Sequence, residues 1–406
     1  MNILFLSGII PKQLENYVIR NTTGNVEFAA NKYQQLMIKG LKRTQSHLTV
    51  LNSMYVNSFP RGFKKPIVRA HADMVNETNA NDAFINTGFL NIFGIRHFSK
   101  YIHVKSEMKK WLRNHGNNRD NCVVGYSVFG EALDAFRDVK KSNSNVQTCL
   151  VVPDLPNYCR GSSKLYNRYL SYIDKKLGNY QIFIDKYILF SKYMAEELKI
   201  NENQYIVVEG ICDDTFAEEE VQEISANKKT VLLYTGALEE KYGLITLLDA
   251  FEQLNKENIE LHFCGSGTAE AQLQVKGAED NRIVLHGKVS NAQATKLQKE
   301  ADILVNPRTN EGIYTRFSFP SKTMEYLVSG TPMIGYKLDG IPDEYDQFIT
   351  YINGPTVKDL ADAINKMVAM GEESRADLGK RARAFIIEYK NPVAQMQRVE
   401  DFLKRG

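Results

Sequence analysis

Short runs of β-branched and aliphatic residues alternate with stretches of helical periodicity along the whole 406-residue chain. This alternation predicts βαβ units, and therefore an α/β fold with mainly parallel sheets. The strands expected in the first half are Ile3–Ser7, Leu48–Asn52, Asn121–Gly125, Thr148–Val152, Tyr187–Phe190 and Tyr205–Val208. The helices expected between them include Glu27–Leu41, Phe129–Lys140 and Ser163–Leu177.

A second alternation begins near Lys229. Its expected strands are Thr230–Thr235, Ile259–Cys264, Ile283–His286, Ile303–Asn306, Met333–Gly335 and Phe348–Tyr351. Its expected helices are Leu244–Leu254, Ala269–Val275, Asn291–Glu300, Pro320–Ser329, Val357–Met370, Glu373–Tyr389 and Pro392–Lys404. The polar, acidic stretch 213–228 between the two alternations predicts a linker. Open parallel sheets bind ligands at the carboxyl ends of their strands, so two such domains predict a ligand cleft.

Composition excludes several classes of protein. Lysine and arginine total 51 and the acids 48, so a net charge of +3 argues against a general nucleic-acid binder. The longest apolar runs have strand length, far below the ~20 residues of a membrane-spanning helix. Residues 1–8 lack the basic start and cleavage site of a secretory signal. Five scattered cysteines without a C-x-x-C motif favour neither disulfides nor a zinc site. We therefore expect a cytoplasmic protein.

The loop before the helix at 320–329 has the features of an anion site. A strand ends at Asn306, Ser318 is the expected N-cap, and Pro320 suits the first helical turn. The first amides of such a helix lack intrahelical partners and favour a phosphate. Ser321 and Glu325 lie four residues apart on one helix face, where a carboxylate can accept two hydrogen bonds from a ribose diol.

Three cations, Arg308, Arg316 and Lys322, fall in or beside the same loop. Together with the helix N-terminus they would bind a diphosphate. The plainer alternative is a basic loop with solvated side chains in front of an ordinary buried helix.

Several short motifs of the second half, taken in their order and spacing, resemble the nucleotide-sugar glycosyltransferases of family 4, which have the GT-B fold. The motifs are Tyr234–Leu238 with Lys241-Tyr242-Gly243, Phe263–Gly267, His286–Val289, Ala301–Pro307, Ser318–Leu327, Gly330–Ile334 and Gly340–Glu344. The resemblance implies two Rossmann-like, doubly wound domains facing across a cleft. Their expected bounds are 1–212 and 229–390, with linker 213–228, and the last helix, 391–406, packing back on the first domain.

The resemblance also implies roles for individual residues. Glu325 would hold the nucleotide ribose, and Lys241 would grip the donor diphosphate after the turn at Gly236. The backbone of Gly287, Lys288 and Val289 would meet the nucleobase. The loop that contains Ser318, Phe319 and Ser321 matches the glycine-rich phosphate loop of the family.

This sequence departs from the family pattern at three places. Phe317 stands where the first acid of a pair spaced eight apart belongs, and Ala237 replaces the usual arginine of the turn. Glu311-Gly312 looks like the family's Glu-Gly but lies fourteen residues before Glu325. We expect Arg308 or Arg316 to compensate, because a diphosphate needs cationic partners.

The first half supplies fewer candidates. Asp154 follows an expected strand where the family often has His-Asp, and it would orient donor or acceptor hydroxyls; an ordinary turn is the alternative. Gly8 falls where the family's first loop faces the diphosphate and acceptor. Gly210 belongs to a stretch, Val208–Asp213, that resembles the segment approaching the donor.

A helix expected at 99–113 is basic and amphipathic. Its apolar arc contains Tyr101, Val104, Met108, Trp111 and Leu112, and the remainder carries Lys100, Lys105, Lys109, Lys110 and Arg113. Such a helix can lie on the inner membrane face as a peripheral contact. The alternative is a helix that faces the protein core and leaves its basic side in solvent.

Other chemistries lack their motifs. No D-x-D triplet occurs, which argues against metal-dependent transferases, and no zinc-protease, P-loop or hydrolase motif is present. Gly265–Glu270 lacks the third glycine of a dinucleotide fingerprint. We therefore expect no metal and no cofactor besides the donor.

The sequence thus predicts a hexosyltransferase that moves a sugar from a nucleoside diphosphate to a hydroxyl of a glycan or lipid-linked glycan, in cell-surface polysaccharide synthesis. The resemblance implies retention of anomeric configuration without a metal. Lys241, Arg308, Arg316, Lys322 and helix amides would stabilise the leaving diphosphate. Two alternatives stay open: a non-catalytic GT-B subunit that binds a partner transferase or a glycan, and a nucleotide-sugar epimerase.

Overall fold

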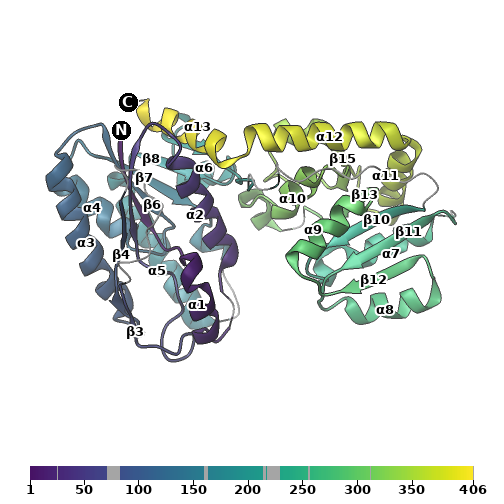
Figure 1. The fold of residues 1–406 in the computed structure, drawn as a ribbon, viewed down its shortest axis with the longest axis horizontal. Helices are drawn as coiled ribbons and strands as arrows, with labels where there is room; N and C mark the ends of the chain where they lie inside the picture. Colours follow the sequence, from purple (N-terminus) through teal and green to yellow (C-terminus); the bar gives the residue numbers. More distant parts are fainter. Residues whose placement is uncertain are drawn as a thin grey trace. The chain divides into compact units, whose positions relative to one another are not determined.

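The structure is a computed structural model that describes residues 1–24, 26–70, 83–159, 163–213, 216, 229–254, 257–310 and 312–405. It contains two compact units (Figure 1). Unit 1 comprises Met1–Ile211 and Pro392–Gly406, and unit 2 comprises Cys212–Asn391. All but two residues of the linker expected at 213–228 lie outside the described residues.

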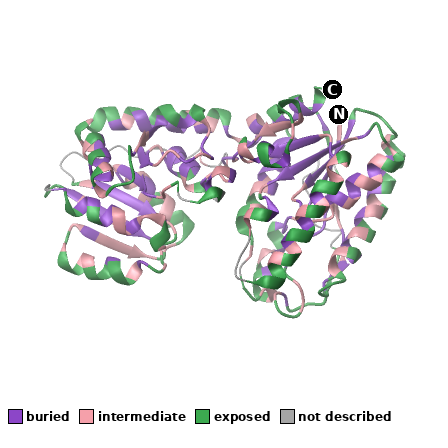
Figure 2. Ribbon diagram, turned by 180° about the vertical axis from the view of Figure 1, so that it is seen from behind, coloured by how far each residue is buried: buried purple, intermediate pink, exposed green. Residues whose placement is uncertain are grey.

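Unit 1 is built on a seven-stranded parallel sheet with the strand order β4-β2-β1-β6-β7-β8-β9. Its strands are β1 (Asn2–Ser7), β2 (His47–Asn52), β4 (Ala83–Asn86), β6 (Asn121–Tyr126), β7 (Gln147–Val152), β8 (Lys186–Leu189) and β9 (Tyr205–Val207). A short antiparallel pair, β3 (Ile67–Val68) and β5 (Phe89–Leu90), lies outside this sheet. The central strands are buried because helices cover the sheet (Figure 2).

The helices of unit 1 are α1 (Glu15–Asn21), α2 (Phe28–Leu41), α3 (Arg96–His115), α4 (Ala132–Ser142), α5 (Lys164–Tyr180), α6 (Tyr193–Leu198) and α13 (Pro392–Lys404). The six strands expected from the sequence are all present, with shifts of one residue at several ends. Strand β4 was not expected. It is an edge strand whose residues are all at least partly exposed, and its apolar run, Ala83-Phe84-Ile85, is shorter than the runs that identify a buried strand.

Unit 2 has a six-stranded parallel sheet with the order β12-β11-β10-β13-β14-β15. Its strands are β10 (Thr230–Thr235), β11 (Ile259–Cys264), β12 (Ile283–Gly287), β13 (Ile303–Asn306), β14 (Met333–Gly335) and β15 (Ile349–Tyr351). Its helices are α7 (Leu244–Glu252), α8 (Glu270–Glu279), α9 (Asn291–Glu300), α10 (Ser321–Ser329), α11 (Val357–Ala369) and α12 (Glu372–Tyr389). The expected strands and helices are present here too, with small shifts at their ends.

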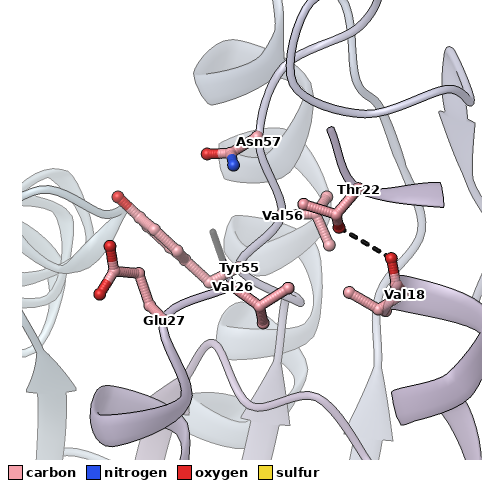
Figure 3. A pocket seen from close by; sticks show the side chains of 7 residues that line it. All are labelled: Val18, Thr22, Val26, Glu27, Tyr55, Val56 and Asn57. Carbon is pink, nitrogen blue, oxygen red and sulfur yellow. Dashed lines mark hydrogen bonds between the residues drawn. The ribbon is translucent and has the colours of Figure 1, made fainter. Parts of the chain in front are cut away.

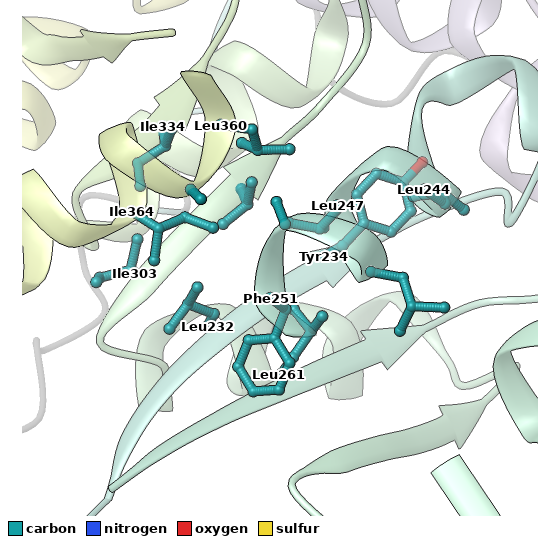
Figure 4. Packing of buried hydrophobic residues seen from close by; sticks show 14 of the residues in the cluster. Leu232, Tyr234, Leu244, Leu247, Phe251, Leu261, Ile303, Ile334, Leu360 and Ile364 are labelled. Atoms are coloured by element: carbon teal, nitrogen blue, oxygen red, sulfur yellow. The ribbon is translucent and has the colours of Figure 1, made fainter. Parts of the chain in front are cut away.

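One hydrophobic core cluster of unit 2 lies between its sheet and the helices α7 and α11, and a second contains residues of α10 and α12. Leu232 and Leu261 from the sheet meet Phe251 of α7 and Ile364 of α11, and all four side chains are fully buried (Figure 4). Tyr234 closes this cluster at the carboxyl end of β10. The core therefore fixes the end of the strand from which the first site loop departs.

The last helix, α13, packs against α2 in unit 1. A Cβ atom on Gly40 of α2 would be 2.1 Å from the carbonyl oxygen of Pro392, so only glycine allows this approach. Met396 and Leu403 of α13 are fully buried in the core of unit 1. Lys186 of β8 donates a hydrogen bond of 2.6 Å to the carbonyl of Phe402, where a helix C-terminus favours a cation.

The apolar arc expected to contact a membrane faces the interior of unit 1. Val104, Met108 and Trp111 of α3 are at most 6% exposed. Lys100, expected on the solvated side, is 4% exposed and donates hydrogen bonds to the carbonyls of Ser53 (3.2 Å) and Met54 (2.8 Å). The membrane prediction for this arc is therefore wrong, and the alternative of a core-facing helix is right. In the described part of the chain, none of the helices is both long enough and apolar enough to cross a bilayer.

Candidate active site

Three loops at the carboxyl ends of neighbouring strands of unit 2 are bonded backbone to backbone. The amide of Gly236, after β10, donates to the carbonyl of Cys264 at 2.8 Å. The amide of Gly265, after β11, donates to the carbonyl of Gly287 at 2.9 Å. Gly265 has φ +150°, and a Cβ atom there would be 1.7 Å from the oxygen of Gly236. Glycine at 265 therefore lets these loops form one continuous edge of the sheet.

Lys322, the second residue of α10, extends its side chain onto this edge. Its Nζ atom lies 5.3 Å from the ring centre of Tyr234. A Cβ atom on Gly236 would be only 1.8 Å from the same Nζ atom. Glycine at 236 thus leaves the space that the ammonium group occupies.

Two further cations gather around Tyr242. Lys241 Nζ lies 5.3 Å and the guanidinium of Arg308 5.8 Å from the centre of the Tyr242 ring. The two segments meet because Gly243 has φ +78° and approaches the carbonyl of Pro307; a Cβ atom on this glycine would be 2.3 Å from that oxygen. The aromatic ring holds both cations beside the end of β13.

The electrostatics of Lys322 suit an anionic ligand. Burial lowers the pKa of its ammonium group; Glu325 one turn further along α10 opposes this shift, and Arg308 adds to it. Among the described residues, neither Lys241 nor Lys322 forms an ion pair or a hydrogen bond. A partly desolvated ammonium without a direct ion pair is costly by itself and favours the binding of an anion such as phosphate.

A buried hydrogen-bond network joins α10 and α9 to the end of β10. The hydroxyl of Tyr326 on α10 accepts from the amide of Thr235 at 3.0 Å. Gln298 of α9 donates to the hydroxyl of Thr235 at 2.8 Å. All three side chains are buried. They tie α10 to the end of β10, so Lys322 and Gly236 keep their relative positions.

The structure corrects the cap of α10 and gives Arg316 an acidic partner. The N-cap is Pro320, without a side-chain hydrogen bond, so the prediction of Ser318 as N-cap is wrong. Arg316 forms an ion pair with Asp339 at 3.5 Å, and Asp339 also accepts from Asn310 at 3.0 Å. Tertiary packing thus gives Arg316 a carboxylate partner from the segment that follows β14.

Most of the other residues expected to contact the sugar-nucleotide donor lie at or near the surface of unit 2. Glu325 and Ser321 are exposed on α10, and Lys288 is exposed beside half-buried Val289. Phe319 packs on the buried ring of Tyr345, with a centre-to-centre distance of 5.3 Å. Glu311 lies outside the described residues.

The candidates in unit 1 lie at the carboxyl ends of its strands. The amide of Gly8, after β1, donates to Gln34 at 2.9 Å. The carbonyl of Gly210 accepts from Gln395 of α13 at 3.0 Å. Asp154, after β7, is exposed on part of its surface; partial desolvation raises the pKa of its carboxyl, and the charge of Glu27 raises it further.

A small pocket lies at the same edge of unit 1. Its lining consists of Val18, Thr22, Val26, Glu27, Tyr55, Val56 and Asn57. The hydroxyl of Tyr55 and the carboxylate of Glu27 extend to the same side of it (Figure 3). These groups offer hydrogen bonds to a polar ligand, and nothing in the sequence pattern singled them out.

Three tyrosines of unit 2 near these cations are not among the site residues predicted from the sequence. Tyr234, Tyr242 and Tyr326 all fall inside the motifs of the second half. The available signal was position, because Tyr242 is adjacent to Lys241 and Tyr234 ends a strand just before Gly236.

Comparison with known proteins agrees with this architecture. Residues 216–385 match a family model described as glycosyl transferases group 1. A search of curated proteins finds no match. Among solved structures, the lipopolysaccharide outer core galactosyltransferase WaaB is similar, with a TM-score of 0.60 and 16% identity over 99% of both chains.

Two further structures share the fold. Anabaena HepE in complex with UDP has a TM-score of 0.57 and 14% identity over 99% of both chains. WaaG, a glycosyltransferase of lipopolysaccharide biosynthesis, has a TM-score of 0.55 and 12% identity over 100% of both chains. Identities this low establish the fold only. The chain has a GT-B fold, and the match over residues 216–385 supports a glycosyltransferase.

Proposed function

We propose that this protein transfers a hexosyl group from a nucleoside-diphosphate sugar to a hydroxyl of a glycan or lipid-linked glycan in the cytoplasm, during synthesis of a cell-surface polysaccharide. The observation that carries the proposal is the cation edge of unit 2, formed by Lys241, Arg308 and Lys322 around Tyr234, Tyr242 and Gly236. Among the described residues, neither of its two lysines forms a direct ion pair or a hydrogen bond.

The cation edge fits the charge that develops in such a transfer. The bond between the anomeric carbon and the diphosphate oxygen breaks, the acceptor oxygen bonds to that carbon, and the acceptor proton passes to the leaving diphosphate. Lys241, Arg308 and Lys322 would stabilise the negative charge that grows on the leaving diphosphate. This stabilisation lowers the activation barrier of the transfer most when the cations are in position before the reaction. Glu325, one turn along α10, would hold the ribose hydroxyls. We also propose that the transfer retains the configuration of the anomeric carbon and needs no metal ion, because the motif resemblance implies both properties.

The similar structures support the choice of substrates. WaaB is described as a galactosyltransferase of the lipopolysaccharide outer core, and HepE was solved with UDP. We therefore propose a nucleoside diphosphate as the carrier and a surface glycan as the acceptor.

The test is donor turnover by the purified protein across a panel of nucleotide sugars. Lys322→Ala should reduce turnover by about 100-fold, in the range seen when one preorganised donor to a developing charge is removed. Lys358→Ala, which removes an exposed lysine of α11, is the matched control and should keep the wild-type rate. Equal rates for the wild type and Lys322→Ala would remove Lys322 from the site.

One observation favours a second function, that of a non-catalytic GT-B subunit. Phe317 is 5% exposed and cannot supply the carboxylate expected at its position. Calorimetry with UDP, GDP and ADP separates the two functions, because a subunit without a donor site binds none of them. Conversion of a nucleotide sugar without any acceptor, observed by NMR, would instead indicate an epimerase.

A further inference from the structure

Two of the seven histidines of the chain meet on neighbouring strands of unit 2. His262 lies on β11 and His286 on β12, and their ring centres are 5.0 Å apart. Nε2 of His286 is 3.1 Å from Nδ1 of His262, and Nε2 of His262 is 3.1 Å from one carboxylate oxygen of Glu260. Lys229 pairs with the other oxygen of Glu260 at 3.0 Å. We call these four side chains the histidine network.

The carboxylate determines the direction of each hydrogen bond in the histidine network. Although burial opposes ionisation, hydrogen bonds from Lys229 and His262 lower the pKa of Glu260, so its carboxylate is ionised and can only accept. A neutral His262 therefore carries its proton on Nε2, and its bare Nδ1 accepts from the Nε2–H group of His286. Burial and the neighbouring His262 lower the pKa of His286, which keeps that ring neutral at pH 7.

The histidine network bridges an irregular point of the sheet. β12 is the strand at the edge of the sheet, next to β11 (Figure 1). Leu285 pairs with Phe263 but Gly287 pairs with Cys264, so His286 is the extra residue of a β-bulge. A bulge disrupts the backbone ladder and leaves its extra residue unpaired. The side chain of His286 therefore adds a link to β11 at the position where the backbone pairing shifts.

The bulge leads directly into the turn Gly287–Val289, for which the motif resemblance implies contact with the nucleobase. Gly287 has φ +67°, and its carbonyl accepts from the amide of Gly265 at 2.9 Å. On the other side of the turn, Ser290 caps α9 by accepting from the amide of Gln293 at 3.3 Å. One end of the turn is thus fixed by a helix cap, and the other end depends on the bulged end of an edge strand.

We propose that Glu260, His262 and His286 are positioning residues for the donor: they hold the bulged end of β12 and thereby keep the backbone of Gly287–Val289 in place for the nucleobase. This inference rests on the proposed function, because it requires a nucleotide donor. The side chains of Glu260 and His262 are only 23% and 16% exposed, and shielding from water strengthens their hydrogen bond. Order that exists before binding reduces the entropy lost when the nucleotide binds.

The experiment is calorimetry with two kinds of ligand: the nucleoside diphosphates UDP, GDP and ADP, and inorganic pyrophosphate, which has no base. His286→Phe keeps an aromatic ring and removes both ring nitrogens. This variant should bind the nucleotide preferred by the wild type about 5-fold more weakly, as expected for the loss of one hydrogen bond, and should bind pyrophosphate unchanged. Equal nucleotide affinity for the wild type and His286→Phe would overturn the proposal, and so would an equal loss for pyrophosphate.

His262→Gln tests the assigned hydrogen bonds by rescue. A glutamine can donate to Glu260 through its amide nitrogen and accept from His286 through its oxygen. This variant should keep most of the nucleotide affinity, whereas His262→Phe should lose about 5-fold. His103→Phe, at an exposed histidine of α3, is the matched control and should bind both ligands like the wild type. If His262→Gln binds nucleotide as weakly as His262→Phe, the proposal is wrong.

A second measurement needs no ligand. Amide hydrogen exchange, followed by mass spectrometry, should be faster over residues 283–290 in His286→Phe than in the wild type, while residues 230–235 of β10 exchange at an unchanged rate. Unchanged exchange over 283–290 would contradict the proposal even if the nucleotide affinity falls. A wild type that binds neither pyrophosphate nor any nucleotide would instead contradict the proposed transferase function. Hydrogen exchange would still decide whether the histidine network fixes the turn.

Discussion

Lys322 and Gly236 lie in direct contact, because a Cβ atom on Gly236 would stand 1.8 Å from the Lys322 Nζ atom. Gly236 also has φ +134°, a conformation that other residues rarely adopt. The lysine of α10 and the glycine after β10 therefore form one element of the candidate site, although they are 86 positions apart in the sequence.

The first prediction concerns this contact. Gly236→Ala should displace the ammonium of Lys322 and weaken nucleoside-diphosphate binding by about 10-fold or more, measured by calorimetry. Gly371→Ala is the control for backbone strain, since Gly371 has φ +81° and open space around its Cβ position. That control should lose some stability but keep its affinity. Equal affinities of the wild type and Gly236→Ala would show that the contact has no part in binding.

The second prediction is that Lys322→Met separates stability from function. Removing a partly desolvated ammonium that forms no direct ion pair should raise the free energy of unfolding by about 1 kcal/mol in urea titrations at pH 7. The same variant should lose most of its diphosphate affinity. In the wild type, affinity should fall as pH rises through the lowered pKa of Lys322, and this dependence should disappear in the variant. A destabilised variant that still binds would contradict the argument.

The third prediction concerns Lys100. Burial lowers its pKa to about 8, against 10.5 for an ordinary lysine. Between these values the unfolded chain holds more protons, so this group makes the free energy of unfolding rise with pH, by up to about 3 kcal/mol. Below pH 8, Lys100 is charged in both the folded and the unfolded state, so its contribution to the free energy of unfolding no longer changes with pH. Urea titrations from pH 7 to 10.5 should show a smaller rise for Lys100→Met than for the wild type; parallel curves would exclude the shift.

The fourth prediction concerns the docking of α13. Gly40→Val should cost about 3 kcal/mol or more of unfolding free energy, because its Cβ atom alone would lie 2.1 Å from the oxygen of Pro392. Gly178→Val, on exposed α5 with nothing near its Cβ position, is the matched control and should have little effect. Thermal unfolding of both variants measures the difference.

Much of the fold was predictable, because buried strands such as Thr230–Thr235 carry continuous apolar runs. The edge strand β4 was not, since its apolar run, Ala83-Phe84-Ile85, is short and its residues are partly exposed. The helical periodicity located α3 but misjudged Lys100. Periodicity assigns a lysine to solvent, whereas the carbonyls of Ser53 and Met54, about 46 positions away in the sequence, supply the hydrogen bonds that allow its burial.

The site was predictable only in part. The motifs selected Lys241, Arg308 and Lys322, and the structure places these cations around neighbouring tyrosine rings. Arg316 belongs to the same basic loop, but its partner Asp339 comes from a segment whose approach depends on tertiary packing. Tertiary packing between distant segments decides whether a cation faces a ligand or a neighbouring carboxylate. The sequence around the cation does not predict this packing.

The return of α13 to unit 1 has a consequence for biosynthesis. Met396, Val399, Phe402 and Leu403 complete a hydrophobic core whose other buried members are encoded before position 212. A ribosome releases these four residues only after all of unit 2 has been translated. Unit 2 can therefore mature first, and the amino-terminal unit must wait with an open apolar groove until translation is nearly finished.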